Sequence, residues 1–193
     1  MIDQSNAIDY RKNLIILSAP SATGKNTVFN AVKTIKPDVE RVITVTTRAP
    51  RKNEKDGVDY YFLTDAVFRQ KEKNGEFVES NSYDDGFYAT PYSEINRYPE
   101  TTLLFLIVDI NGMKAVKDKY PFSKSIFLMP PSIEELKSRI SSRGDNTPEE
   151  IEKRIGMAVL EINESKNYDF VVVNNDVVTA AKEIVKIIST QEI

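Results

Sequence analysis

One stretch near the N-terminus, residues 14–33 with the sequence LIILSAPSATGKNTVFNAVK, constrains the fold most strongly. Four apolar residues lead into a loop of small residues, and Gly24-Lys25 precedes an apolar pattern at helical spacing. A buried strand that turns into a helix leaves backbone N–H groups unpaired at the helix start, where the helix dipole is positive. With a lysine at the turn, this arrangement predicts a site for a nucleotide phosphate chain.

The phosphate-loop pattern G-x-x-x-x-G-K-[ST] is only partly met in this stretch. Ala19 stands at the position of the first glycine and Asn26 at the Ser/Thr position, although Thr27 follows directly. The prediction therefore depends on the order of strand, small-residue loop, Gly-Lys and amphipathic helix. The alternative is an ordinary strand-turn-helix with an exposed lysine.

The composition excludes several kinds of chemistry. The 193 residues include no cysteine and no histidine, which removes disulfides, cysteine nucleophiles, Ser-His-Asp hydrolysis and histidine-based zinc sites. Phosphoryl transfer stays open because it depends mainly on positive charge and positioning. A net charge of −3 gives no general attraction to nucleic acid or to a membrane surface. Residues 1–13 are unlike a signal peptide and the longest apolar run is too short to span a bilayer, so we expect a cytoplasmic protein.

Apolar strands alternate with helical segments in much of the chain. We predict strands at LIIL (14–17), LLFLIV (103–108), SIFLM (125–129) and FVVV (170–173), with VITVT (42–46) as a fifth. Ser132 with Glu135 and Thr147 with Glu150 predict capping boxes that begin two helices, the second of which runs to about residue 167. Near-continuous apolar strands separated by helices predict an α/β fold with a five-stranded parallel sheet covered on both faces.

Two segments interrupt this alternation. Residues 44–92 are rich in short strands and are interpreted as an inserted subdomain. The stretch 141–149 is polar, contains a glycine and lies between two capped helices, which favours a mobile lid. A single domain is therefore expected, with its core at 1–43, 93–140 and 156–193 and its lid at 141–155.

Six motifs in order resemble those of guanylate kinases along nearly the full chain. The family patterns are S-G-P-S-G-x-G-K, T-T-R-x-P-R, G-x-D-Y-x-F, E-F-x-E, Y-G-[ST] and R-x-x-x-R-G. The corresponding segments here are SAPSATGK (18–25), TTRAPR (46–51), GVDYYF (57–62), EFVE (76–79), YAT (88–90) and RISSRG (139–144). The resemblance implies a P-loop nucleoside monophosphate kinase fold and, in purine metabolism, ATP-dependent phosphorylation of GMP and dGMP to the diphosphates.

The resemblance also implies that residues 44–92 bind GMP. Arginine forks grip phosphate bidentately and tyrosine hydroxyls donate to it, while a carboxylate that accepts from N1–H and the 2-amino group selects guanine. The implied phosphate ligands are Arg48, Arg51, Tyr60 and Tyr88, and the implied base contacts are Glu79, Thr44, Thr90 and Asp109. Taken singly, Tyr60 could be a core residue, Glu79 a solvated charge at a strand end, and Arg51 part of a basic run.

On the ATP side, the resemblance implies a phosphate site and a set of catalytic cations. The ATP-binding residues are Ser21, Ala22, Thr23, Gly24, Lys25, Asn26, Thr27 and Asn174, and the catalytic residues are Lys25, Arg139, Arg143 and Arg154. The arginines would stabilise the transferring phosphoryl group as the lid excludes water; the alternative is a solvated helix face. Mg²⁺ is expected with ATP, near Asn26 or Thr27, in a monomer or homodimer.

Several residues depart from the family pattern. Ala19, Ala22 and Ala89 replace glycines, Asn26 follows Lys25, and Ile107 replaces an acid. An alanine held at positive φ costs about 1–2 kcal/mol, which weakens a loop without abolishing it. Two hypotheses therefore stay open: an active guanylate kinase with a modified phosphate loop, or a non-catalytic GMP-binding or protein-interaction module.

Overall fold

The computed structural model describes residues 13–83, 86–142 and 147–190. The chain divides into two compact units, one of residues 1–15 and 40–124 and the other of residues 16–39 and 125–193. We call these the first unit and the second unit. The boundary between them lies within strand β1 (Leu14–Ser18).

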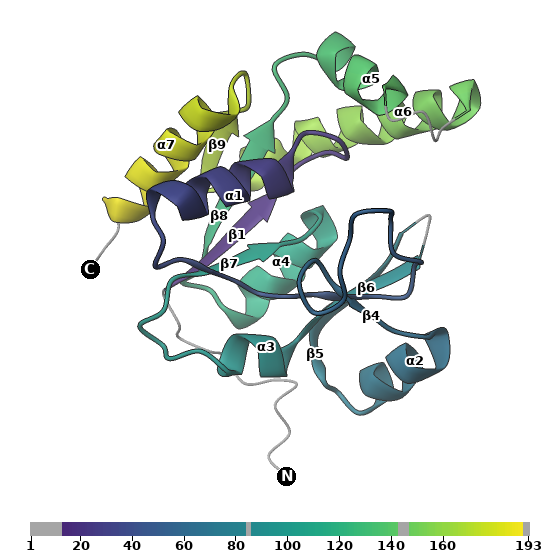
Figure 1. Ribbon diagram of the computed structural model, residues 1–193, viewed down its shortest axis with the longest axis vertical. Coiled ribbons are helices and arrows are strands. Elements are labelled where there is room, and N and C mark those ends of the chain that lie inside the picture. The colour runs from purple at the N-terminus through teal and green to yellow at the C-terminus, as the bar shows by residue number, and fades with distance from the viewer. Residues whose placement is uncertain (1–12, 84–85, 143–146, 191–193) are drawn as a thin grey trace. The chain divides into compact units, whose positions relative to one another are not determined.

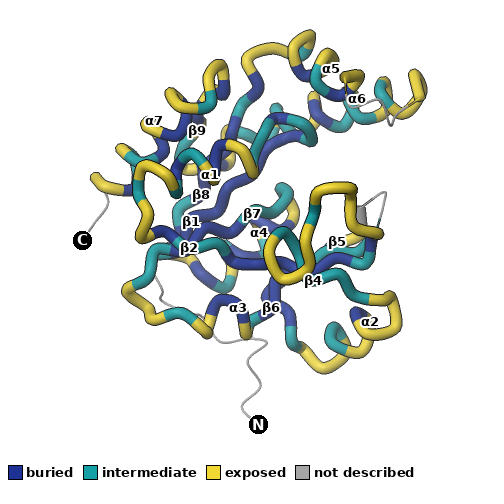
Figure 2. Tube along the Cα trace, in the orientation of Figure 1, coloured by how far each residue is buried: buried dark blue, intermediate teal, exposed yellow. Residues whose placement is uncertain are grey.

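The described residues form a five-stranded parallel sheet with the order β2-β7-β1-β8-β9. Its other strands are β2 (Glu40–Arg41), β7 (Leu104–Ile107), β8 (Lys124–Met129) and β9 (Phe170–Val173). The apolar runs of β1, β7 and β8 are largely buried (Figure 2). This confirms the predicted α/β fold, because strands covered on both faces need side chains that are apolar on both faces.

The prediction of a fifth strand at 42–46 is wrong. The edge strand of the parallel sheet is β2, and the ladder ends where the Val42 N–H donates to the Phe105 carbonyl at 2.8 Å. Strand β3 (Val45–Thr46) belongs to a different sheet, where it pairs with β6. β-branched residues suit either sheet, so only tertiary pairing could decide between them.

The second sheet lies wholly in the first unit and has the order β4-β3-β6-β5. It consists of β4 (Tyr61–Phe62), β3, β6 (Gly86–Pro91) and β5 (Phe77–Tyr83), with β5 and β6 antiparallel. Its core cluster contains Val45, Phe68, Phe77 and Ala89. Helices α2 (Asp65–Lys73), α3 (Tyr92–Asn96) and α4 (Ile110–Lys119) complete the described part of this unit (Figure 1).

The second unit contains α1 (Lys25–Ile35), α5 (Ile133–Ser141), α6 (Pro148–Asn163) and α7 (Val177–Ser189). Helices α1 and α7 lie side by side, as do α5 and α6 (Figure 1). The predicted helix to residue 167 changes into a 3₁₀ turn at Glu164–Asn167. No described helix in either unit has the length and apolar character needed to cross a membrane.

The two predicted capping boxes differ in outcome. At Thr147 the box is complete, since its side chain accepts from the Glu150 N–H and the Glu150 carboxylate accepts from the Thr147 N–H. At Ser132 the side chain accepts from the Glu135 N–H at 3.1 Å, but the Glu135 carboxylate forms an ion pair with Arg139. Both helices nevertheless start where the sequence predicts.

Candidate active site

The loop between β1 and α1 has the geometry expected of an anion site. Gly24 is the N-cap residue of α1 with φ +97°, a left-handed conformation in which glycine has no steric penalty. A Cβ at Gly24 would lie 3.2 Å from the Asn174 amide nitrogen, so the position is also crowded. Glycine therefore lets the loop turn directly into α1, whose first N–H groups have no intrahelical partners.

Ala22 is the departure from the family pattern that has a conformational cost. Its φ is +66°, and among the described residues it is the only non-glycine residue with positive φ. Ala19 and Ala89 are buried without such strain, and Ala89 belongs to a core cluster. Ala22 packs against the cluster of Leu136, Ile140 and Ala158 on α5 and α6. Burial of its methyl group is worth about 0.8 kcal/mol and offsets much of the backbone cost.

The loop carries its expected cation and is held by a buried amide. Lys25 Nζ donates to the Ala19 carbonyl at 2.7 Å, so the lysine side chain bends back over the loop. Asn174, which follows β9, is 2% exposed and donates from Nδ2 to the Thr23 carbonyl at 2.7 Å. Among the residues that the structure describes, none is a hydrogen-bond partner of Asn174 Oδ1 or of the buried Thr23 hydroxyl. Asn174 therefore supports the loop, in which Ser21 is half-buried.

The cations expected on the lid side lie on two adjacent helices. Arg139 of α5 is half-buried and donates from Nε to Glu135 at 3.0 Å, and Arg154 of α6 is half-buried. Lys137 and Glu152 join the two helices by an ion pair of 2.6 Å. Arg143, the fourth predicted catalytic residue, lies outside the described residues. The predicted lid at 141–155 overlaps α6 and stays a prediction.

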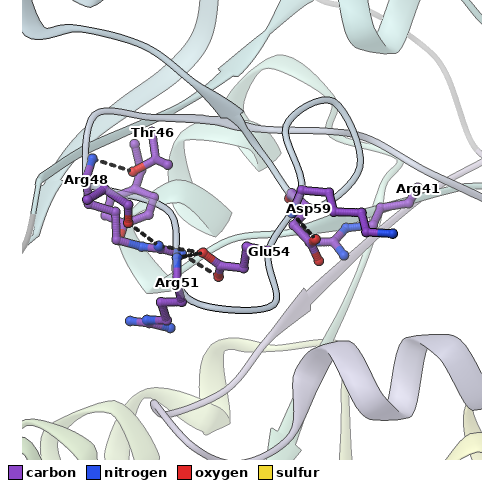
Figure 3. Close-up of polar contacts among 9 residues, drawn as sticks. Arg41, Thr46, Arg48, Arg51, Glu54 and Asp59 are labelled. Atoms are coloured by element: carbon purple, nitrogen blue, oxygen red, sulfur yellow. Dashed lines mark hydrogen bonds and ion pairs between the residues drawn. The ribbon is translucent and has the colours of Figure 1, made fainter. Parts of the chain in front are cut away.

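In the first unit, the Arg48 guanidinium is gripped by protein groups (Figure 3). Its Nη1 and Nη2 each donate to one oxygen of Glu54 at 2.7 Å, and its Nε donates to the Tyr88 hydroxyl at 3.0 Å. The guanidinium also lies 5.1 Å from the ring centroid of Tyr60 and 5.8 Å from that of Phe62. The structure thus brings together Arg48, Tyr60 and Tyr88, three of the residues that the resemblance implies as phosphate ligands.

Electrostatics within this group favour the charged forms of both partners. Burial alone would lower the pKa of Arg48, but hydrogen bonds and charge attraction from Glu54 and Tyr88 raise it above its ordinary value. Burial likewise opposes ionisation of Glu54, yet donation from Arg48 and from the Arg51 N–H keeps its pKa below the ordinary value. The Arg51 side chain is exposed and extends away from Glu54 (Figure 3).

A second polar group in the first unit contains two carboxylates. Glu79 of β5 is buried and accepts from the Thr90 hydroxyl at 2.6 Å. Asp109 caps α4, accepting from the Gly112 N–H at 2.7 Å. A Cβ at Gly112 would lie 2.9 Å from the Val108 Cβ and 3.3 Å from both Glu79 Oε2 and Asp109 Oδ1, so only glycine fits where α4 approaches the two carboxylates. Burial, together with the Asp109 charge, raises the pKa of Glu79 to about 7, although donation from Thr90 opposes the shift.

Thr44, the remaining predicted base contact, is buried next to this sheet. Its neighbour Ile43 donates its N–H to Glu94 of α3 at 3.3 Å, and the Tyr61 hydroxyl donates to the same carboxylate at 3.0 Å. The Thr44 carbonyl accepts from the Tyr61 N–H. Buried polar groups with these partners hold the backbone at Thr44 in one conformation.

Sequence reasoning missed three residues that shape these groups. Glu54 has no role in the motifs above, although a carboxylate three residues after the basic segment TTRAPR is a recognisable partner for Arg48. Asn81 donates to Asp109, and Gly112 lets α4 approach β5. The roles of Asn81 and Gly112 depend on tertiary contacts between β5 and α4. These segments lie far apart in the sequence, so no local pattern indicates either role.

The described residues include no cluster of three acidic side chains that could hold a metal. Asn26 and Thr27 lie exposed in the first turn of α1 and offer an amide oxygen and a hydroxyl oxygen. Mg²⁺ commonly keeps several waters and binds phosphate oxygens with one or two protein ligands. This donor set therefore fits a metal that arrives with a nucleotide.

Comparison with known proteins identifies the family to which the chain belongs. The family model described as guanylate kinase matches residues 11–191. A guanylate kinase from Prochlorococcus marinus subsp. pastoris is 40% identical over 180 residues, covering 93% of this chain and 98% of that protein. One from Clostridioides difficile is 39% identical over 180 residues, covering 93% and 88%.

A solved structure gives the same result. The crystal structure of guanylate kinase from Anaplasma phagocytophilum matches with a TM-score of 0.77 and 29% identity, over 96% of this chain and 89% of that one. Nothing in these matches favours the alternative of a non-catalytic module. The chain belongs to the guanylate kinase family of ATP-dependent phosphotransferases that convert GMP to GDP.

Proposed function

We propose that this chain binds GMP through the first unit and ATP through the β1–α1 loop of the second unit. It transfers the γ-phosphoryl group of ATP to GMP. One observation carries the acceptor assignment: two carboxylates, Glu79 and Asp109, both lie close to Gly112, and Glu79 accepts from the hydroxyl of Thr90. A guanine edge offers N1–H and two 2-amino hydrogens, which are three donors that carboxylates accept.

In this proposal the two carboxylates divide the guanine edge. Glu79 accepts from N1–H and from one 2-amino hydrogen, while Asp109 accepts from the other. Adenine lacks both donors at these positions, so it would leave two partly buried carboxylates without partners. Thr44 and Thr90 contact O6 or the remaining ring positions, with Thr90 also holding Glu79 in place.

The monophosphate of GMP would be held by Arg51, Tyr60 and Tyr88, with Arg48 behind the tyrosines. Arg48 lies over the Tyr60 ring and donates to the Tyr88 hydroxyl, and Glu54 fixes its guanidinium. Residues 44–92 therefore form the proposed GMP-binding subdomain. A bidentate arginine and tyrosine donors supply the charge and the orientation that phosphate recognition needs.

The ATP phosphates would bind at residues 21–27, against the N-terminus of α1, with Asn174 supporting the loop. Lys25 would exchange its loop carbonyls for phosphate oxygens. Arg139, Arg143 and Arg154 would stabilise negative charge on the transferring group, and the segment 141–155 would exclude water by closing. A divalent cation, Mg²⁺, supplies charge neutralisation at the phosphates when bound, and Asn26 or Thr27 would hold it. No proton-abstracting histidine is required.

The test is a coupled assay of ADP formation with GMP, dGMP and AMP as acceptors. We expect turnover with GMP and dGMP and none above background with AMP. GMP binding without turnover would leave only the non-catalytic module.

We also propose a cytoplasmic protein that acts as a monomer or homodimer on these two small molecules and does not bind nucleic acid or membranes. Sedimentation would check its oligomeric state, and cell fractionation would check its location.

Lys25→Ala provides the sharper test of the donor site. Loss of the ammonium should lower kcat by about a hundredfold or more, because one preorganised electrostatic group contributes a factor of this size. Lys33→Ala on the same helix is the matched control, since its Nζ donates to the Val39 carbonyl away from the loop. Calorimetry should give unchanged GMP affinity for both variants. An unaltered rate for Lys25→Ala would contradict the role given to this lysine.

A further inference from the structure

Asn81 of β5 is a polar residue outside the expected GMP ligands, and it contacts one of the two carboxylates. Its Nδ2 donates to Asp109 Oδ2 over a short distance of 2.5 Å. The other Asp109 oxygen accepts from the Gly112 N–H at 2.7 Å. Asp109 is thus held from two directions, by the backbone of its own helix and by a side chain of the neighbouring strand.

The orientation of the Asn81 amide is itself fixed. Its Oδ1 accepts from the Ser82 N–H at 2.9 Å, and a backbone N–H can only donate. The amide oxygen must therefore face the backbone, which leaves the NH₂ group facing Asp109. This assignment follows from the chemistry of the partners at both ends of the amide.

Asn81 also lies on the same face of β5 as Glu79. Side chains two residues apart on a strand share a face, and the residue between them points the other way. Ser80 does so, since its hydroxyl donates to Glu72 of α2 at 2.7 Å. In the β5–β6 ladder, Asn81 pairs with Tyr88, and Glu79 pairs with Thr90. The strand therefore aligns Asn81 with the residues assigned to GMP.

We propose that Asn81 is a positioning residue that orients Asp109 toward the 2-amino group of guanine and so determines preference for GMP over a base that lacks this group. The inference rests on the proposed function, because it needs Asp109 to contact the base. Without Asn81, Asp109 would keep its bond to the Gly112 N–H but would lose the hydrogen bond that Asn81 donates to Oδ2. A hydrogen bond from the base to a less firmly oriented carboxylate is weaker.

The experiment compares GMP with inosine monophosphate, which keeps N1–H and O6 but has no 2-amino group. Asn81→Ala should raise KM for GMP by about tenfold, the value of one charge-assisted hydrogen bond, with kcat within about twofold. Its kcat/KM for inosine monophosphate should change by less than about twofold, which also shows that the variant is folded. Asn81→Asp should lower the GMP preference further, because a third carboxylate repels Asp109. Ser80→Ala, on the opposite face, is the control and should leave the ratio unchanged.

Asp109→Asn and Glu79→Gln separate this inference from the proposed function. Asparagine keeps the N-cap of α4 through its Oδ1, so the first variant replaces the charged acceptor Oδ2 with an amide NH₂, which cannot accept from the base or from Asn81. If Asp109→Asn lowers the GMP preference and Asn81→Ala does not, the role of Asn81 is overturned and the base assignment stands. Equal losses for both substrates in Asn81→Ala would assign Asn81 a purely structural role and also overturn it. If neither carboxylate variant changes the preference, the proposed reading of guanine fails.

Discussion

Replacing Glu79 with glutamine should stabilise the folded protein above neutral pH while weakening its binding of GMP. Glu79 is 9% exposed, accepts from the Thr90 hydroxyl and faces the charge of Asp109. A glutamine has nearly the same shape, and its Oε1 can still accept from Thr90. Its amide group can also donate toward Asp109, so the substitution replaces repulsion with attraction.

The magnitude follows from the pKa of Glu79, which burial and the Asp109 charge raise from 4.5 to about 7. The folded state therefore holds a proton that the unfolded chain releases, so stability falls as pH rises from 4.5 to about 7. A rise of this size corresponds to about 3 kcal/mol that is lost at pH 8 and fully present below about pH 4.5. Glutamine does not titrate, so the variant should avoid this loss.

The assay is urea denaturation of the wild-type protein and Glu79→Gln at pH 5, 6, 7 and 8. The variant should be more stable by about 1–3 kcal/mol at pH 8, and the difference should shrink toward zero at pH 5. In parallel, KM for GMP in the wild type should rise as pH falls below about 7, because only the ionised carboxylate accepts from both guanine donors. The phosphate of GMP also ionises near pH 6. The pH dependence of KM in Glu79→Gln, which lacks the titrating carboxylate, shows the contribution of the phosphate alone.

The wild type and Glu79→Gln share all other titrating groups. The contributions of those groups therefore cancel in the difference between the two free energies of unfolding. A stability difference that stays constant between pH 5 and pH 8 would refute the raised pKa as its cause. A variant that keeps wild-type KM for GMP at pH 8 would refute the assignment of Glu79 to the base. The two results are independent, so the electrostatic argument and the functional assignment can fail separately.

Three further substitutions test the structure. Ala22→Gly should change the free energy of unfolding by less than about 1 kcal/mol in thermal denaturation, because relief of strain at φ +66° is offset by the lost methyl burial and by glycine's unfolded-state entropy. Glu54→Gln should lower the free energy of unfolding by about 2–4 kcal/mol in urea denaturation, because it leaves the buried Arg48 without a carboxylate. An unchanged free energy of unfolding would show that the pair is not buried in solution. Thr147→Ala should cost about 1 kcal/mol, measured as a melting temperature lower by about 2–4 °C, because it removes the cap of α6, and Thr190→Ala beyond α7 should cost less.

The sequence by itself determined the type of fold and the place of the phosphate loop. Apolar strands such as LIIL and FVVV, and the cap at Thr147, predicted elements that the structure contains because these signals are local. Gly24 adopts the left-handed conformation that the turn into α1 requires. The six motifs in order predicted the family for the same reason, since each is a short segment whose chemistry can be recognised without its neighbours.

Tertiary structure decided what these local signals leave open. The β-branched run at 42–46 suits two sheets, and hydrogen-bonding partners assigned Val45 and Thr46 to the smaller one. The strain expected of three alanines falls on Ala22 alone, because φ depends on the path of the loop. Asn81 and Asp109 are 28 residues apart along the chain, and only the packing of α4 on β5 brings their side chains into contact. Burial and proximity set the pKa of Glu79, and neither property exists until the chain has folded.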